Sequence, residues 1–247
     1  MKKHIPNLLT LCNLLCGCIA IVYTLQNRLE TAVLFVLLGL ILDFFDGFVA
    51  RILKVQSPIG KQLDSLADVV TFGVVPAFFM VEMIFKAVEN DFSKTEEIFS
   101  SGLTCLAPPI LPYIGLLIAL ASAYRLAKFN IDTRQTDSFI GLPTPANALW
   151  IIFLPMIPSE WTFSLLDNVW VLIGLTFLSC YLLNANIHMF ALKFKKRSYK
   201  ENQLQYNFII LSIILLIFLQ FTAVPLIIGL YVLVSLFFSR KQKETPR

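Results

Sequence analysis

The sequence predicts an all-α membrane protein, a polytopic transmembrane bundle of about eight helices. Hydrophobic residues make up 57% of the 247 residues, and the mean hydropathy is +0.75, whereas a soluble domain is less apolar. Charged residues make up only 15%, too few to cover the surface of a water-soluble protein of this length. The apolar residues also lie in long runs that would leave no solvated face. These observations exclude a soluble domain.

Eight apolar runs are read as membrane helices, since crossing a hydrocarbon core of ~30 Å takes about 20 helical residues. The first four runs cover residues 6–26, 31–53, 65–85 and 105–124. The connection between the second and third runs is short and contains Pro58 and Gly60, so we expect it to return the chain as an antiparallel helix. The polar, acidic linker over 88–102 is expected to be an external loop.

The last four runs cover residues 142–158, 165–184, 204–222 and 224–238. The fifth run is short and carries Pro143, Pro145 and Pro155. The eighth run is also short, and only a tight turn near Pro225 separates it from the seventh. We therefore expect the last two runs to form a helical hairpin.

The distribution of basic residues tests this map independently. With the N-terminus in the cytoplasm, eight crossings place every Lys and Arg on the cytoplasmic side except Arg28, Lys86 and Lys94. The positive-inside rule predicts this bias, so we expect a multi-pass protein of the cytoplasmic (inner) membrane with both termini in the cytoplasm. Because the basic residues flank apolar runs, the net charge of +4 indicates contact with membrane lipid and not with nucleic acid. The densest cluster, over 193–200, either belongs to this bias or recruits anionic lipid.

We expect one integral membrane domain over residues 1–247, because no segment is long enough to fold separately. Within it, residues 1–185 would form a six-helix catalytic core. Residues 186–203 would form a basic cytoplasmic loop, and residues 204–247 the C-terminal hairpin and tail.

Four aspartates interrupt the second and third runs, where a carboxylate is costly and therefore marks a candidate functional site. Asp43 and Asp46 are three residues apart, which places them on one helix face. Asp64 and Asp68 are four residues apart, with the same consequence. An antiparallel return brings both pairs to one membrane depth on the cytoplasmic side. Carboxylates that face one another repel unless cations lie between them, and oxygen ligands without His or Cys select Mg²⁺ or Mn²⁺. Two such ions match the clamp used for displacement at phosphorus.

Small and polar residues accompany the acids. Gly47 and Ala50 leave the neighbouring helix face bare, so a bulky substrate group can approach the backbone, and Arg51 is placed to pair with a phosphate. Thr10 and Asn13 share one face of the first helix and either line a nucleotide pocket or pack against other helices. A different class, a cation transporter, would also hold membrane acids. It would not need Gly47, Ala50 and Arg51 at fixed offsets.

The chain resembles the CDP-alcohol phosphotransferases over its first six helices. All eight positions of that family's signature are present, in the pattern Asp43-x2-Asp46-Gly47-x2-Ala50-Arg51-x8-Gly60-x3-Asp64-x3-Asp68. The resemblance implies a helical bundle, commonly a homodimer, with a polar cavity open to the cytoplasm and to the leaflet. The C-terminal helix pair resembles an addition found in some members.

The resemblance also implies roles for the signature residues. The four aspartates would bind two divalent metal ions, Mn²⁺ or Mg²⁺, and Asp68 would also act as the general base on the acceptor hydroxyl. Gly47, Ala50 and Gly60 would make room for the cytidine nucleotide of a CDP-lipid. Arg51 would hold phosphate or order the acidic cluster.

Three further segments resemble the subgroup of bacterial phosphatidylserine synthases, namely residues 6–17, 124–130 and 139–146. Lys128 and Thr144 stand where that subgroup more often has Arg and Ser, and these swaps keep a charge and a hydroxyl. Arg125, Lys128 and Asn130 are expected at the cytoplasmic end of the fourth helix, near the acids. They would bind the acceptor's carboxylate or a lipid phosphate. The alternative is that Arg125 and Lys128 are anchors at the membrane interface, and for Lys128 the two interpretations are equally good.

The subgroup resemblance implies an enzyme of phospholipid biosynthesis. Its substrates would be CDP-diacylglycerol and L-serine, and it would transfer the phosphatidyl group to the serine hydroxyl with release of CMP. The same chemistry with inositol phosphate, glycerol phosphate or choline as the acceptor stays open.

Overall fold

The structure is a computed structural model of the chain and describes residues 4–55, 57–96, 110–131, 140–162, 165–189 and 202–244. Helices account for most of these residues, and the β-structure among them is an isolated antiparallel bridge between Ile140 and His188. Within the described ranges, five helical stretches are long and apolar enough to cross a membrane, and two shorter apolar helices accompany them. The predicted all-α, polytopic fold is confirmed.

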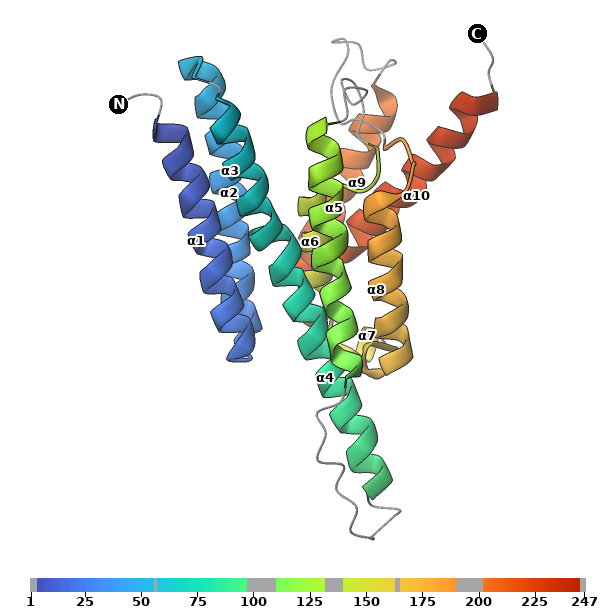
Figure 1. The fold of residues 1–247 in the computed structure, drawn as a ribbon. Helices are drawn as coiled ribbons and strands as arrows, with labels where there is room; N and C mark the ends of the chain where they lie inside the picture. Colours follow the sequence, from blue (N-terminus) through green and yellow to red (C-terminus); the bar gives the residue numbers. More distant parts are fainter. Residues whose placement is uncertain are drawn as a thin grey trace.

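The first two crossings are α1 (Ile5–Leu25) and α2 (Leu29–Leu53), which confirm the spans predicted over 6–26 and 31–53. Pro6 lies in the first turn of α1, where its missing N–H has no intrahelical partner to lose. Asn27, with a φ of 59°, makes the tight turn between the two helices, which pack side by side (Figure 1). This pair forms one wall of the site described below.

The third crossing is one continuous helical rod. It consists of α3 (Pro58–Asp68), a π-helical turn (Val69–Val74) and α4 (Val75–Glu96). The π-helical turn widens the backbone directly after Asp68, and such turns occur frequently at functional sites.

Both ends of this rod differ from the sequence-based expectation. The predicted start at residue 65 is wrong, because Ser57 caps the helix by accepting a 3.0 Å hydrogen bond from the Gly60 N–H and Pro58 fits the first turn. Pro58 and Gly60 therefore begin the helix and do not form a loop. At the other end α4 continues to Glu96, so the first part of the linker predicted over 88–102 is helical. Residues 97–102 lie outside the described residues.

The fourth crossing begins with a 3₁₀ turn (Leu111–Leu116) that continues into α5 (Leu117–Ile131). It ends one to two turns beyond the predicted residue 124, so Arg125, Lys128 and Asn130 all lie within the helix. The predicted start at residue 105 lies outside the described residues.

The fifth and sixth predicted runs correspond to the shorter apolar helices α6 (Thr144–Ile152) and α8 (Val169–Asn184). A 3₁₀ turn (Leu154–Met156), α7 (Ser159–Thr162) and a second 3₁₀ turn (Leu165–Asp167) connect them. Proline explains the shortness of α6, because Pro143 precedes it and Pro155 cannot continue its hydrogen-bond ladder.

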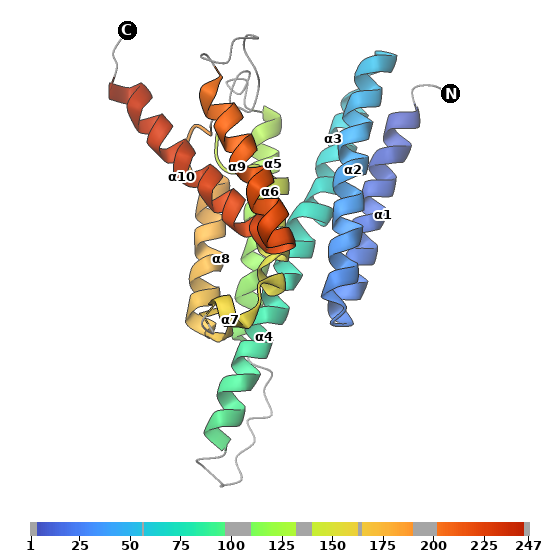
Figure 2. The ribbon, with the colours of Figure 1, turned by 180° about the vertical axis from the view of Figure 1, so that it is seen from behind.

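The C-terminal hairpin consists of α9 (Gln203–Leu219), a 3₁₀ turn (Gln220–Thr222) and α10 (Ala223–Glu244). Figure 2 shows the two helices diverging from their connection. The hairpin is confirmed, but its turn is centred on Gln220, which has a φ of 51°, while Pro225 lies in the first turn of α10. Residues 190–201 of the predicted basic loop lie outside the described residues.

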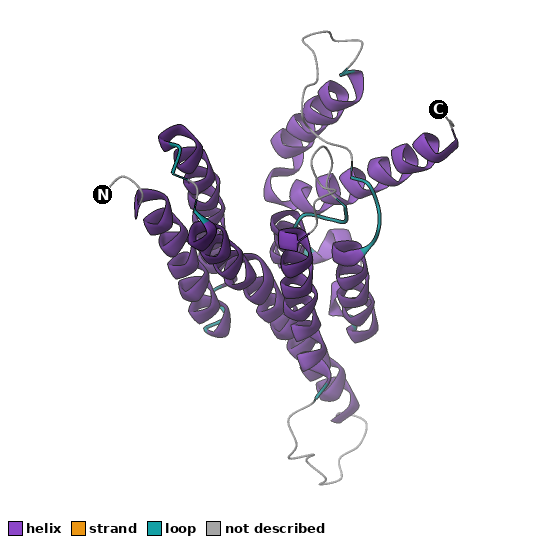
Figure 3. Cartoon of the chain, turned by 45° about the horizontal axis from the view of Figure 1, so that its top comes forward, coloured by secondary structure: helices purple, strands orange, loops and turns teal. Residues whose placement is uncertain are grey.

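The helices form two groups that the α3–α4 rod connects (Figures 1 and 3). The first group is α1, α2 and α3, and the second packs α5, α6 and α8 around α4. The main apolar core includes Phe79 and Met80 of α4 with Ile118 and Leu172 of the second group, and it extends to buried residues of α1 and α2. The start of α1, the α2–α3 connection and the end of α5 lie at one end of the molecule, as alternating crossings require. The acidic segments of α2 and α3 therefore lie in the first group, towards that end.

Candidate metal and nucleotide site

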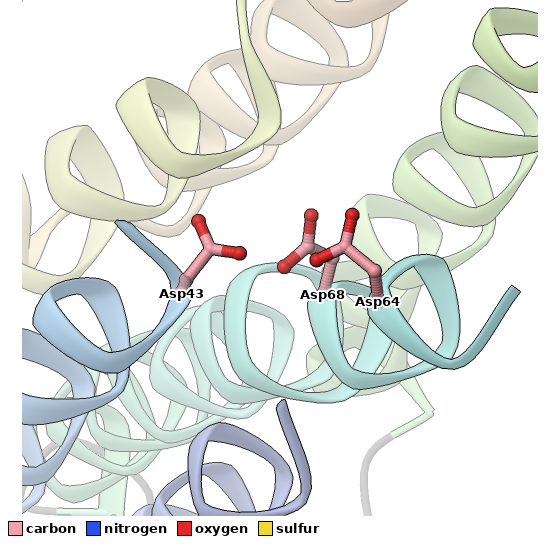
Figure 4. A group of neighbouring side chains, drawn as sticks. All are labelled: Asp43, Asp64 and Asp68. Atoms are coloured by element: carbon pink, nitrogen blue, oxygen red, sulfur yellow. The ribbon is translucent and has the colours of Figure 1, made fainter. Parts of the chain in front are cut away.

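Three of the four aspartates meet in space. Asp43 projects from α2 towards Asp64 and Asp68 on α3, as Figure 4 shows. One carboxylate oxygen from each residue lies within 4.8 Å of the others. The four-residue spacing on α3 puts Asp64 and Asp68 on the face that α2 opposes, as the sequence predicted.

The fourth aspartate, Asp46, lies beside this group and is held differently. Its side chain is buried and accepts a 2.5 Å hydrogen bond from the Thr10 hydroxyl of α1. The same hydroxyl lies 3.1 Å from the Pro6 carbonyl oxygen, its ordinary partner one helical turn earlier. Asp46 thus forms a bridge from the acidic group to α1.

The donor set of Asp43, Asp64 and Asp68 fits a hard divalent cation. All three ligands are carboxylate oxygens, which Mg²⁺ and Mn²⁺ prefer. Oδ1 of Asp68 is buried and has no hydrogen-bond partner among the described residues, which is costly for a carboxylate unless a cation satisfies it. The three residues could therefore hold a metal ion.

A cavity of about 600 Å³ opens beside the acids. It lies between the first turns of α1, the last turns of α2 and the start of α3. Its lining residues are Pro6, Asn7, Thr10, Asp46, Gly47, Ala50, Arg51, Val55, Ser57, Pro58, Gly60, Lys61 and Asp64. The cavity thus includes five of the six residues predicted to bind the CDP-lipid, all except Asn13.

Gly47 leaves open space in the wall of the cavity. A Cβ added at Gly47 would meet nothing within 4 Å, so any larger side chain would project into the free volume. Arg51, one turn later, is exposed and donates from Nε to the Gly47 carbonyl oxygen at 2.9 Å. Arg51 lines the cavity, where its guanidinium can meet a phosphate.

Asn13 is placed elsewhere. It lies one turn deeper in α1 than Thr10, is fully buried, and does not line the cavity. A Cβ at Gly39 of α2 would come within 2.9 Å of the Asn13 Oδ1, and the Thr71 hydroxyl donates to the Asn13 carbonyl oxygen at 3.1 Å. Of the two readings that the sequence left open for Asn13, the contacts favour helix packing.

Six lining residues were not among the predicted site residues, and Asn7 and Lys61 are two of them. Asn7 lies one turn before Thr10 on the same helix face, so the spacing that identified Thr10 could have identified it. Lys61 lies in the segment that was expected to be a connection, which concealed its position on a helix.

The three candidate acceptor residues of α5 have different surroundings. Arg125 is buried, donates to the Thr144 hydroxyl of α6 at 2.8 Å, and lies within electrostatic reach of Asp68. Lys128 lines a separate small recess together with Arg125. Asn130 donates to the Ser65 hydroxyl of α3 at 2.7 Å. Among the three, Arg125 is thus the residue whose charge interacts with Asp68.

Comparison with known proteins agrees with this geometry. The family model described as CDP-alcohol phosphatidyltransferase matches residues 3–180, and α9 and α10 lie beyond the match. A protein of Bacillus subtilis (strain 168) named CDP-diacylglycerol–serine O-phosphatidyltransferase is 36% identical over 156 residues, which cover 62% of this chain and 75% of that protein.

Two further relatives carry the same name. The protein of Methanocaldococcus jannaschii is 34% identical over 176 residues, 71% of each chain. The protein of Helicobacter pylori (strain 26695) is 33% identical over 163 residues, 64% of this chain and 60% of that protein. The matched segment contains all the aspartates, the cavity and α5. The chain belongs to the CDP-alcohol phosphatidyltransferase family.

Proposed function

We propose that this protein transfers the phosphatidyl group of CDP-diacylglycerol to the hydroxyl of L-serine, giving phosphatidylserine and CMP. The observation that carries the proposal is the meeting of Asp43, Asp64 and Asp68 beside a cavity of about 600 Å³. The relatives named above support serine as the acceptor.

The cavity is the proposed site of the CDP group. Gly47 and Ala50 keep α2 bare along its wall, which leaves room for a ribose and a base. Arg51 and Lys61 are the cationic side chains among its lining residues and would pair with the diphosphate. The lipid tails would then extend into the surrounding leaflet.

The proposed ligands of two divalent ions, Mn²⁺ or Mg²⁺, are the four aspartates. Asp43, Asp64 and Asp68 offer oxygens directed at one another, and Asp46 would join them from its position beside Thr10. The chemistry that such ions supply is neutralisation of the diphosphate and stabilisation of the departing CMP.

Asp68 is the proposed general base. Its Oδ1 is buried without a partner among the described residues, so it can accept the proton of a serine hydroxyl placed next to it. As that proton moves to Asp68, the serine oxygen forms a bond to the lipid-bearing phosphorus. The bond between this phosphorus and the CMP oxygen breaks, and CMP leaves with the electron pair.

Arg125 is the proposed site for the serine carboxylate. Its guanidinium, buried and within electrostatic reach of Asp68, would hold the amino acid with the hydroxyl facing the base. A fork of N–H donors matches a carboxylate in geometry as well as in charge. Lys128 and Asn130 stay predictions as acceptor residues, and their contacts give them less support.

Three finer expectations belong to the same proposal. They are the cytoplasmic membrane as the location, the active site and both termini on the cytoplasmic side, and a homodimer. The bias of Lys and Arg towards the sequence segments on the same side as the α2–α3 connection supports the orientation. Cysteine accessibility at the α2–α3 connection tests the side, and chemical cross-linking in membranes tests the homodimer.

An acceptor screen tests the reaction. Purified protein with Mn²⁺ and CDP-diacylglycerol is expected to release CMP when L-serine is added. Release with only inositol phosphate, glycerol phosphate or choline would overturn serine as the acceptor and keep the family chemistry. Ion flux without any CMP release would favour the transporter alternative.

A further inference from the structure

Two hydrogen bonds tie the end of α5 to α3 beside the acidic group, and a third bond within α3 joins them. Asn130 Nδ2 donates to the Ser65 hydroxyl at 2.7 Å, and Lys61 Nζ donates to the Asn130 carbonyl oxygen at 3.1 Å. The Ser65 hydroxyl in turn donates to the Lys61 carbonyl oxygen at 3.2 Å. The three residues form a closed ring, which we call the α3–α5 clamp.

The α3–α5 clamp acts on the part of α3 that carries two of the acids. Ser65 directly follows Asp64, and Asp68 comes three residues later on the same helix. The rotation of α3 about its axis decides whether Asp64 and Asp68 face Asp43 on α2. A hydrogen bond at Ser65 restrains this rotation between the two aspartates.

Apolar packing alone does not fix the rotation of α3. Of its eleven residues, all of them described, only Ala67 is buried. The π-helical turn over Val69–Val74 replaces the regular α-helical ladder directly after Asp68, so α3 and α4 do not share one regular register. The polar contact from α5 therefore adds to the packing of α3 against α1 in holding the acidic face in place.

We propose that Asn130 is a positioning residue for the metal centre, acting through Ser65. It holds α3 at the rotation where Asp64 and Asp68 meet Asp43. This inference rests on the proposed metal-dependent function and assigns Asn130 a role other than acceptor binding. Within the α3–α5 clamp, Lys61 lines the nucleotide cavity while Asn130 and Ser65 do not, so these two are the residues to vary.

The test measures Mn²⁺ binding directly, by electron paramagnetic resonance on purified protein in lipid nanodiscs without substrate. Asn130→Ala and Ser65→Ala are each expected to weaken Mn²⁺ binding about tenfold or more, as outer-shell variants of metal sites do. Ser65→Thr keeps the hydroxyl and is expected to bind Mn²⁺ as the unmodified protein does. Both changes break the same hydrogen bond, between Asn130 and Ser65. The Mn²⁺ affinity of the double variant is therefore expected to equal that of the single variant with the lower affinity.

Kinetics separate positioning from substrate contact. At saturating Mn²⁺, the KM values of Asn130→Ala for serine and CDP-diacylglycerol are expected to match those of the unmodified protein. Ile131→Ala is the matched control, because Ile131 neighbours Asn130, is 81% exposed and lies outside the α3–α5 clamp. Its Mn²⁺ binding is expected to be unchanged.

Three results would overturn the inference, each in a different way. Unchanged Mn²⁺ binding in Asn130→Ala would remove the positioning role and leave the proposed function standing. Unchanged Mn²⁺ binding with a raised KM for serine would make Asn130 an acceptor-binding residue. Absence of Mn²⁺ binding in the unmodified protein would overturn the metal-dependent function together with the α3–α5 clamp.

Discussion

Thr10 of α1 donates a 2.5 Å hydrogen bond to the carboxylate of Asp46 on α2. Both residues line the nucleotide cavity, so this bond joins the wall of the cavity to the acidic group. It also explains why Asp46 lies beside the other three aspartates and not among them. Thr10 therefore fixes the direction of one proposed metal ligand.

Replacement of Thr10 tests this relationship. Thr10→Val removes the hydroxyl at nearly constant volume and leaves the buried Asp46 carboxylate without its donor. Hydrogen bonds to charged groups contribute about 1.5–3 kcal/mol, so kcat/KM for CDP-diacylglycerol is expected to fall about tenfold or more. CMP release as a function of lipid concentration measures this effect. Thr10→Ser keeps the hydroxyl and should retain activity, and equal rates in the Val and Ser variants would refute the role of the bond.

Replacement of Asp68 tests the general base. Asp68→Asn keeps the size of the side chain and an oxygen ligand but cannot accept the proton of serine. General bases contribute about 10²–10⁴-fold to the rate, so kcat is expected to fall by that factor while part of the metal affinity is retained. Asp43→Asn serves as the comparison, because it removes a charge from the metal group without removing the base. Full turnover by Asp68→Asn would contradict the assignment.

Gly47→Ala is expected to separate stability from activity. The added methyl group meets no atom within 4 Å, and Ala favours a helix over Gly by about 1 kcal/mol, so the midpoint of thermal unfolding should rise. The same methyl group occupies the nucleotide cavity, so the KM for CDP-diacylglycerol should also rise. Gly229→Ala, another helical site with nothing within 4 Å of the added Cβ, should raise the midpoint without changing KM. An unchanged KM in Gly47→Ala would place the nucleotide elsewhere.

Gly141→Ala is expected to destabilise the protein. Gly141 has a φ of 77°, and an added Cβ would lie 2.5 Å from the Leu183 carbonyl oxygen at the end of α8. A left-handed residue other than Gly costs about 1–3 kcal/mol even where space is free, so the unfolding midpoint in detergent should fall. Gly174→Ala in α8 has open space around the added Cβ and should not lower it. A midpoint equal to that of the unmodified protein would show that the turn before α6 tolerates a side chain.

Arg125→Lys tests how the acceptor is held. Lys keeps the positive charge beside Asp68 but lacks the fork of donors that matches a carboxylate. The KM for serine is expected to rise about tenfold, a loss typical of one charge-assisted hydrogen bond, while the KM for CDP-diacylglycerol stays constant. Initial rates at varied serine measure the first value. A rise in the KM for CDP-diacylglycerol alone would show that Arg125 binds the lipid substrate and not serine.

Much of the fold could be predicted because length and apolar character decide what crosses a membrane. The runs over 6–26 and 31–53 became α1 and α2 almost residue for residue. The start of α3 was missed because residues 58–64 are too polar for an apolar run. The Ser57-Pro58 pair, a helix-starting signal, was available in the sequence.

The candidate site was predictable where it depends on periodicity and not where it depends on packing partners. Spacing alone placed Asp64 and Asp68 on one face, and the structure brings both to Asp43. Spacing placed Asn13 on the same helix face as Thr10. It could not show that Asn13 lies one turn further along α1, outside the cavity and beside Gly39 and Thr71. The bond from Asn130 to Ser65 joins residues far apart in sequence, so no local pattern could indicate it.

The same limit applies to the π-helical turn. Residues 69–74 contain no proline and only one glycine, and their apolar character suits an ordinary α-helix equally well. The turn arises where α3, packed with α1, continues into α4 within the main core. Tertiary packing, and not local propensity, produces it.

The position of bound Mn²⁺ tests most directly the proposal that α2 and α3 share metal ions through their aspartates. Anomalous X-ray diffraction from crystals of the purified protein grown with Mn²⁺ would locate the ions. The expected result is anomalous density between α2 and α3, in contact with carboxylate oxygens of Asp43, Asp64 and Asp68. Density elsewhere, or no density between these three residues at saturating Mn²⁺, would contradict the proposal.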